Sequence, residues 1–182
     1  MYKETPKYPL SDPLPYINDE KNLPSGVVYL GELFEQNHGK RVFYINKKNY
    51  LSIVYMFLNP IKKDGSYLYW QSDFPLRFLT WFPETLTKFR NGQYRGFMTP
   101  NENVDGEMLA ICRDMALGGP DKPGYTVYNF SRHQKAGKPL VYHDDGEEWF
   151  WPMYACWTEE FLFDGGLLDF IRSLHDCRQI KG

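Results

Sequence analysis

KPLVYHDDGEEWFWPMYACWTEEFLFDGGLLDFIRSL, residues 138–174, is the stretch on which our prediction of the fold depends. It holds nine aromatic residues and eight carboxylates, but only two Lys or Arg. Two apolar runs, Leu140–Tyr142 and Trp149–Trp157, flank Asp145-Gly146, and glycine adopts the positive φ of a tight turn at little steric cost. We therefore predict a strand, an acidic turn and a second strand, followed by a helix.

The closing helix has both a start signal and an apolar side. Thr158 is a suitable N-cap, and Glu159 and Glu160 fall in the first turn, where negative charge is stabilised. After the interruption at Gly165-Gly166, an apolar stripe predicts that a helix packs one face on the core. The stripe consists of Leu167, Leu168, Ile171 and Leu174.

Residues 1–24 are predicted to form an extended, proline-rich arm. Five of the thirteen prolines lie in this segment, and proline lacks a backbone N–H and disfavours helix in the residue before it. We expect the apolar residues of the arm to lie along the domain. Residues 25–182 are enough to form one domain with a sizeable core.

Between the arm and residue 138 the sequence predicts mostly strands. They are predicted at residues 27–30, 41–46, 50–58, 67–71, 94–98 and 125–130, with 50–58 and 67–71 forming a hairpin. Short helices are predicted at residues 31–37, stopping at Gly39, and from Pro83 to Gly92. Residues 107–114 fit a strand, although a helix to Ala116 fits nearly as well, and residues 131–137 are predicted to be a loop. Seven or so strands, a few short helices and a C-terminal helix indicate a single α+β domain built mainly on antiparallel sheet.

Charge is unevenly distributed along the chain. The formal net charge is −2, but residues 38–95 hold ten Lys or Arg against three Asp or Glu, whereas residues 138–174 hold two against eight. If these segments do not interleave in the fold, the protein has two electrostatically different faces.

The three cysteines, Cys112, Cys156 and Cys177, show no CxxC spacing. The apolar neighbours of Cys112 and Cys156 predict inert, buried thiols. The N-terminus lacks the basic and apolar pattern of a signal peptide, and no 18-residue apolar run follows it. We therefore expect a cytoplasmic protein.

His143 is the sharpest candidate for catalytic chemistry. With Asp145 or Glu148 it could serve a small hydrolase or transferase, with or without a metal, as an acid–base pair. Adjacent strand residues point to opposite faces, however, so this spacing does not place all the oxygens on one ion. A solvated acidic turn is the favoured interpretation, because no GxSxG, HExxH or phosphate-binding glycine motif is present. We expect no cofactor and no bound metal.

A nucleic-acid-associated protein of phage or plasmid type is a second alternative. Lys47, Lys48, Arg90 and Arg95 lie close to aromatic residues, and cations with aromatics can contact phosphates and stack on bases. The sequence pI near 6.1 and the lack of dense basic runs argue against this role.

The late tryptophans suggest a docking surface. On a strand, Trp149 and Trp151 share one face while Phe150 and Tyr154 share the other, so the strand is either buried on both sides or exposes an apolar patch. Trp and Tyr are enriched at interface centres, and neighbouring acids could steer a basic partner. The predicted partner-binding residues are Asp144, Asp145, Glu147, Glu148, Trp149, Trp151, Glu159 and Glu160.

Three segments together resemble the SMI1/KNR4-like (SUKH) superfamily. They are the proline-led helix Phe82–Gly92, the strand Lys138–Tyr142 with its acidic turn, and the closing segments 158–162 and 167–171. Many members of that superfamily are cytoplasmic immunity proteins that bind and block a bacterial toxin domain. The resemblance implies a non-enzymatic immunity-type inhibitor whose acidic, Trp-rich surface covers a basic toxin or effector domain.

Overall fold

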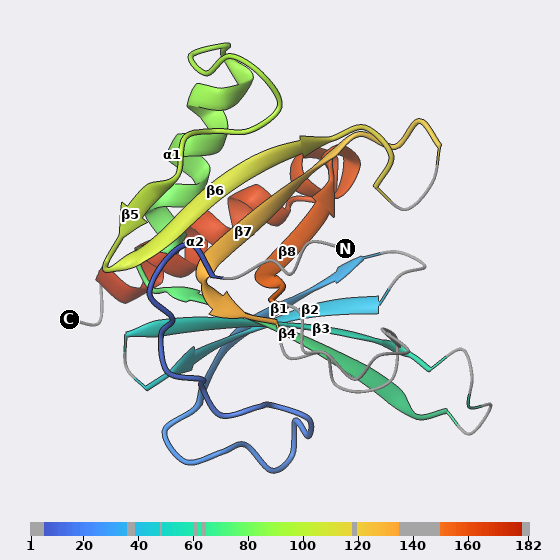
Figure 1. The fold of residues 1–182 in the computed structure, drawn as a ribbon. Coiled ribbons are helices and arrows are strands. Elements are labelled where there is room, and N and C mark those ends of the chain that lie inside the picture. Colours follow the sequence, from blue (N-terminus) through green and yellow to red (C-terminus); the bar gives the residue numbers. More distant parts are fainter. Residues whose placement is uncertain are drawn as a thin grey trace, which may run out of the picture.

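The computed structural model describes residues 6–35, 39–47, 49–59, 62, 65–117, 120–134 and 150–179. Within these residues, eight strands form two antiparallel four-stranded sheets, each in chain order (Figure 1). Sheet A contains β1 (Val28–Glu35), β2 (Gly39–Asn46), β3 (Tyr50–Leu58) and β4 (Tyr67–Pro75). Sheet B contains β5 (Glu102–Val104), β6 (Glu107–Asp114), β7 (Gly124–His133) and β8 (Pro152–Thr158). The helices are α1 (Phe78–Arg90), the π-helix η1 (Glu160–Asp164) and α2 (Leu167–Gln179), which confirms the predicted α+β class.

Sheet A contains the predicted β3–β4 hairpin, paired from Tyr50↔Pro75 to Leu58↔Tyr67. The predicted helix at residues 31–37 is wrong, because Gly31–Glu35 continue β1 along β2. Gly39 does not stop a helix either. It begins β2 with a φ of 118°, and a Cβ there would collide with the carbonyl oxygen of Met56. Strand pairing and close backbone approach therefore override the local helix signals.

Helix α1 begins five residues before the predicted start at Pro83. Phe78 and Phe82 stack at 5.1 Å between ring centroids in the core, and the Trp81 indole donates a hydrogen bond to Glu102 at 2.8 Å. Burial of these aromatic rings favours the extra helical turn even though Pro83 then lies inside the helix.

Three further predictions concern sheet B. Residues 107–114 form strand β6, which resolves the strand-or-helix alternative. The predicted strand at residues 94–98 is wrong, since only Met98 makes an isolated bridge, to Cys112. The predicted loop at residues 131–137 is wrong as far as His133, because cross-strand pairing carries β7 to that residue.

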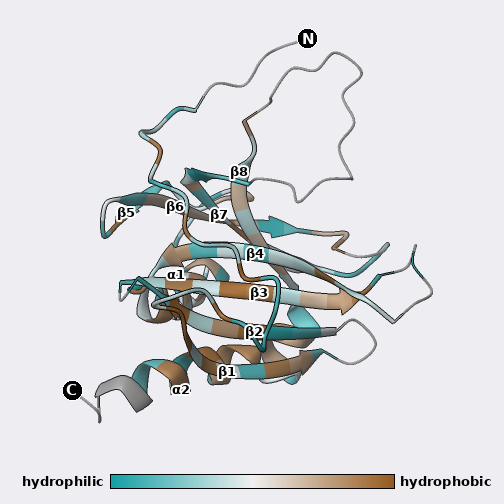
Figure 2. Ribbon diagram, turned by 90° about the horizontal axis from the view of Figure 1, so that it is seen from below, coloured by the Kyte–Doolittle hydropathy of each residue, from teal (hydrophilic) through white to brown (hydrophobic). Residues whose placement is uncertain are grey.

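One hydrophobic cluster joins both sheets to both α-helices. It includes Phe43 of sheet A, Trp157 of sheet B, Phe82 of α1 and the predicted stripe of α2. A second, smaller cluster lies on the other face of sheet A, where Ile17 of the arm packs on apolar residues of β2 and β3. Figure 2 shows the arm crossing this face. Sheet A is therefore covered by apolar packing on both sides.

A buried polar seam connects the two sheets. Nη2 of Arg132 lies 2.7 Å from Glu107, and the Asn129 amide donates to Glu107 and to the backbone carbonyl of Asp73. Arg132 also donates to the carbonyl of Asp12 in the arm at 2.9 Å. Burial raises the pKa of the Asp73 carboxyl, partly offset by the hydrogen bonds that it accepts. The seam fixes β4, β7 and the arm relative to one another.

Candidate functional site

The π-helix η1, together with Glu159 just before it, carries three of the four carboxylates of the candidate site. The Thr158 hydroxyl accepts the backbone N–H of Phe161 at 3.2 Å, so Thr158 caps this helical segment as predicted, although the turn is π rather than α. The backbone N–H of Glu159 donates to the Pro123 carbonyl at 2.9 Å, which holds the segment before β7 against η1. Single π-turns recur at functional sites.

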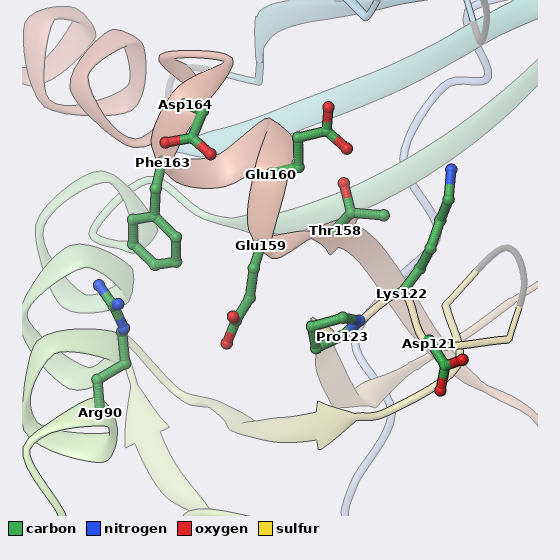
Figure 3. Close-up of a pocket in the computed structure, with 9 residues that line it drawn as sticks. All are labelled: Arg90, Asp121, Lys122, Pro123, Thr158, Glu159, Glu160, Phe163 and Asp164. Carbon is green, nitrogen blue, oxygen red and sulfur yellow. The ribbon is translucent and has the colours of Figure 1, made fainter.

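A hollow of about 410 Å³, the outer hollow, lies between η1, the end of α1 and the segment before β7 (Figure 3). Four carboxylates and two cations line it. The lining residues are Arg90, Asp121, Lys122, Pro123, Thr158, Glu159, Glu160, Phe163 and Asp164. The formal charge of the lining is therefore −2, from four negative and two positive groups.

Some of these charges are already engaged within the chain. The Arg90 guanidinium lies 3.9 Å from the centroid of the Phe163 ring, and Nη2 of Arg113 lies 3.7 Å from Glu159. Burial, together with Glu159, raises the pKa of Tyr125. Glu160 and Asp164 are exposed, and neither makes an ion pair within the residues that the structure describes. These two carboxylates are available to a partner.

A second hollow of about 610 Å³, the corner cavity, lies where sheet A meets β8 and η1. The Arg41 guanidinium lies 3.4 Å from the centroid of the Tyr55 ring, and its Nη2 is 2.8 Å from Oε2 of Glu35. That contact lacks hydrogen-bond geometry. Oε2 of Glu35 and Nη1 of Arg41 have no hydrogen-bond partner in the described part of the chain. Both side chains are about nine-tenths buried, so the cavity contains a nearly buried ion pair that can still accept and donate further hydrogen bonds.

The two hollows share four lining residues, which makes them one continuous acidic face. The shared residues are Lys122, Thr158, Glu160 and Asp164. The corner cavity adds apolar walls and one thiol. Its further lining residues are Phe34, Glu35, Arg41, Tyr55, Leu117, Cys156, Trp157, Phe161 and Gly165.

Of the predicted partner-binding residues, the structure places Glu159 and Glu160 on this acidic face. Trp151 is half exposed, but it precedes β8 whereas Glu159 follows it. Eight residue steps at roughly 3.3 Å separate the two by about 26 Å. Trp157 is buried in the core. The structure therefore does not bring Trp151 and the glutamates together.

The other predicted site residues lie outside the described part of the chain. They are His143, Asp144, Asp145, Glu147, Glu148 and Trp149, together with Lys48 of the nucleic-acid alternative. The first strand and the turn of the predicted hairpin also lie there, whereas its second strand, predicted at residues 149–157, is confirmed as β8. Among the residues that are described, no group of three or more His, Cys, Asp or Glu could hold a metal ion.

Two predictions about charge and cysteine need correction. Arg41 and Arg90, from the basic segment, lie beside acidic residues of the same face, so the basic and acidic segments interleave here. Cys112 and Cys156 are free thiols, and each is only partly buried. Burial nevertheless raises the pKa of each thiol, which favours the protonated, less nucleophilic form.

Sequence reasoning missed the floor of the corner cavity. The sequence pattern places Glu35 in a predicted helix and Arg41 and Tyr55 in predicted strands, and it indicates no functional role for these residues. The alternation of β2 and β3 puts Arg41 and Tyr55 directly opposite each other on one face, which the strand register would have revealed. Nothing local in the sequence connects them to Cys156.

No family model matches this chain, and no curated protein or solved structure is significantly similar to it. In the described part of the chain, no helix is long and apolar enough to cross a lipid bilayer.

Proposed function

We propose that this protein is a non-enzymatic binding module that docks a basic protein domain on the acidic face around η1. The observation that carries the proposal is the outer hollow, where four carboxylates face two cations and the exposed Glu160 and Asp164 are unpaired within the described residues. Negative charge around a concave surface accelerates the approach of a positive partner and disfavours like-charged competitors.

An immunity-type inhibitor that covers a toxin or effector domain is the form of this function that we propose. The resemblance to the SUKH superfamily and the acidic surface support it together. Carboxylates on the inhibitor would pair with Lys or Arg that the toxin uses to hold phosphate, for example in a nuclease.

The nucleic-acid alternative is not favoured by the surroundings of Arg90. This guanidinium stacks on Phe163 and lines a hollow with Glu159 and Asp164, whose carboxylates would repel a phosphate backbone. The hydrolase alternative depends on His143, Asp145 and Glu148, and no described residue supports it.

Charge reversal on η1 tests the proposal. The tagged protein is used to capture a partner from its native host, and the affinity of that partner is then measured by calorimetry. Glu160→Lys plus Asp164→Lys should weaken binding about ten-fold or more at low salt, with a smaller difference at high salt. Glu84→Lys plus Asp169→Lys is the matched control, because it changes the net charge equally at exposed positions outside both hollows. Equal affinity of the two double variants would refute the proposal.

A further inference from the structure

We infer that the corner cavity receives a single arginine residue of the partner. This inference rests on the proposed function, and it names the chemical group of the partner that the corner cavity would hold. The cavity differs from the outer hollow in having aromatic walls and a nearly buried ion pair, Arg41 with Glu35, on its floor.

Charge balance is the first observation. Glu35, Glu160 and Asp164 contribute three negative charges to the lining, against two positive charges from Arg41 and Lys122. One added cation makes the cavity neutral. A small anion would instead meet three carboxylates, and the carboxylates do not form a group that could hold a metal. A cationic side chain is the occupant that this charge distribution fits.

The unsatisfied groups on the floor are the second observation. Apart from its ion pair with Nη2 of Arg41, Oε2 of Glu35 has no hydrogen-bond donor among the described residues, and Nη1 of Arg41 has no acceptor there. Buried polar groups of this kind are almost always partnered in folded proteins. An arginine residue of a polypeptide offers both groups, because its guanidinium carries five donors and its backbone carbonyl is an acceptor.

Aromatic rings are the third observation, and they favour arginine over lysine. The planar guanidinium stacks on aromatic faces and is more weakly hydrated than an ammonium group. The chain already uses this contact twice at the site, with Arg41 over Tyr55 and Arg90 over Phe163. Trp157 and Phe161 also line the cavity but are buried, so the ring open to a further guanidinium is that of Phe34, whose side chain is 71% exposed.

The first test titrates N-acetyl-arginine amide into the isotopically labelled full chain and follows the backbone amide signals by NMR. Signals of cavity residues such as Cys156 and Leu117 should shift. N-acetyl-citrulline amide has nearly the same shape without the charge, and it should bind about ten-fold or more weakly, because a charge-assisted hydrogen bond to a carboxylate is lost. Equal binding of the two compounds, no binding of either, or shifts confined to other surfaces would overturn the inference.

Two variants make the test specific to the cavity. Glu35→Gln should reduce the affinity for N-acetyl-arginine amide while leaving the citrulline compound unaffected. Because Glu35 is nearly buried and that variant could misfold, Leu117→Trp provides a second variant. It adds bulk at the cavity wall and leaves every charge in place. It should abolish binding of the arginine compound without changing the thermal melt.

The Leu117→Trp variant also separates this inference from the proposed function. If the captured partner binds Leu117→Trp as tightly as wild type but binds Glu160→Lys plus Asp164→Lys about ten-fold or more weakly, the arginine site is wrong and the acidic docking face stands. If both variants bind like wild type, the docking face itself is wrong.

Discussion

Replacing Arg132 by methionine should strongly destabilise the fold, because it leaves a carboxylate buried without its counter-charge. Nε and Nη2 of Arg132 lie 3.0 and 2.7 Å from the two oxygens of Glu107, and the two side chains are only 3% and 2% exposed. Removing one partner of a buried ion pair typically costs about 3–5 kcal/mol. We expect the free energy of unfolding to fall by an amount in that range.

Other contacts of Arg132 add to this effect. Its Nη1 anchors the arm through the Asp12 carbonyl, and its guanidinium lies 4.6 Å from the centroid of the Tyr50 ring. Burial raises the pKa of Asp73 and the charge of Arg132 partly offsets that rise, so loss of Arg132 should favour protonation of this carboxyl further.

Urea denaturation followed by tryptophan fluorescence measures the change. Arg172→Met is the matched control, because Arg172 also pairs with a carboxylate, Asp169 at 3.1 Å, but at the surface, where such pairs contribute about 0–1 kcal/mol. The double variant Glu107→Gln plus Arg132→Met should be more stable than Arg132→Met alone, since the uncompensated charge is gone. A loss below about 1 kcal/mol for Arg132→Met, comparable to an ordinary surface substitution, would refute the reasoning.

Two further predictions follow from the groups whose pKa burial raises. Because the pKa of Asp73 is raised above 3.8, the folded state binds more protons than the unfolded state around that pKa, and this group's contribution to stability falls as the pH rises through it. Asp73→Asn should flatten that part of the pH–stability profile measured by urea denaturation, and an unchanged profile would contradict the assignment. In the folded protein at neutral pH, Cys156 should react slowly with iodoacetamide, because burial raises the pKa of its thiol. In urea it should react at the ordinary rate of a free thiol, and peptide mass spectrometry measures both rates. Rapid labelling of the folded protein would show that this thiol is not protected.

The elements that the sequence predicted well are those whose signals are local and agree. Residues 50–58 are nearly all apolar and are followed by turn residues before residue 67, and they form one strand of the β3–β4 hairpin. The apolar stripe of α2 lies after two glycines and is buried as its spacing predicts. In both cases composition, periodicity and turn chemistry indicate the same element.

The elements that the sequence did not predict depend on contacts between distant segments. Gly31 looked like the start of a helix, but it lies in β1 beneath Phe170, where a Cβ would be 2.9 Å from the ring. Pro83 looked like the first residue of a helix, but α1 begins at Phe78, and Phe82 packs on Trp157 of β8 at 5.4 Å between ring centroids. A local rule cannot anticipate a packing partner that lies some 140 residues away in the chain.

The candidate site likewise has one part that local sequence signals predicted and one part that depends on the fold. The charge pattern alone indicated Glu159 and Glu160, because clustered carboxylates need no knowledge of the fold. The corner cavity required the register of sheet A and the crossing of sheet B over it, which bring Glu35 and Arg41 beside Cys156. The sequence could therefore indicate the charged rim of the site but not the Glu35–Arg41 pair on the floor of the corner cavity.

Contacts between sheet A and β8 connect the polar seam to the corner cavity. The Ser72 hydroxyl of β4 donates to the Tyr154 carbonyl of β8, and Trp70 packs on Tyr154 at 5.5 Å between ring centroids. These contacts fix the position of β8 on sheet A two residues before Cys156. Hydrogen bonds are directional, so these polar contacts, together with the shared apolar cluster, help to fix the angle at which the sheets meet. The shape of the corner cavity follows from that angle, because its floor belongs to sheet A and its opposite wall to β8 and η1.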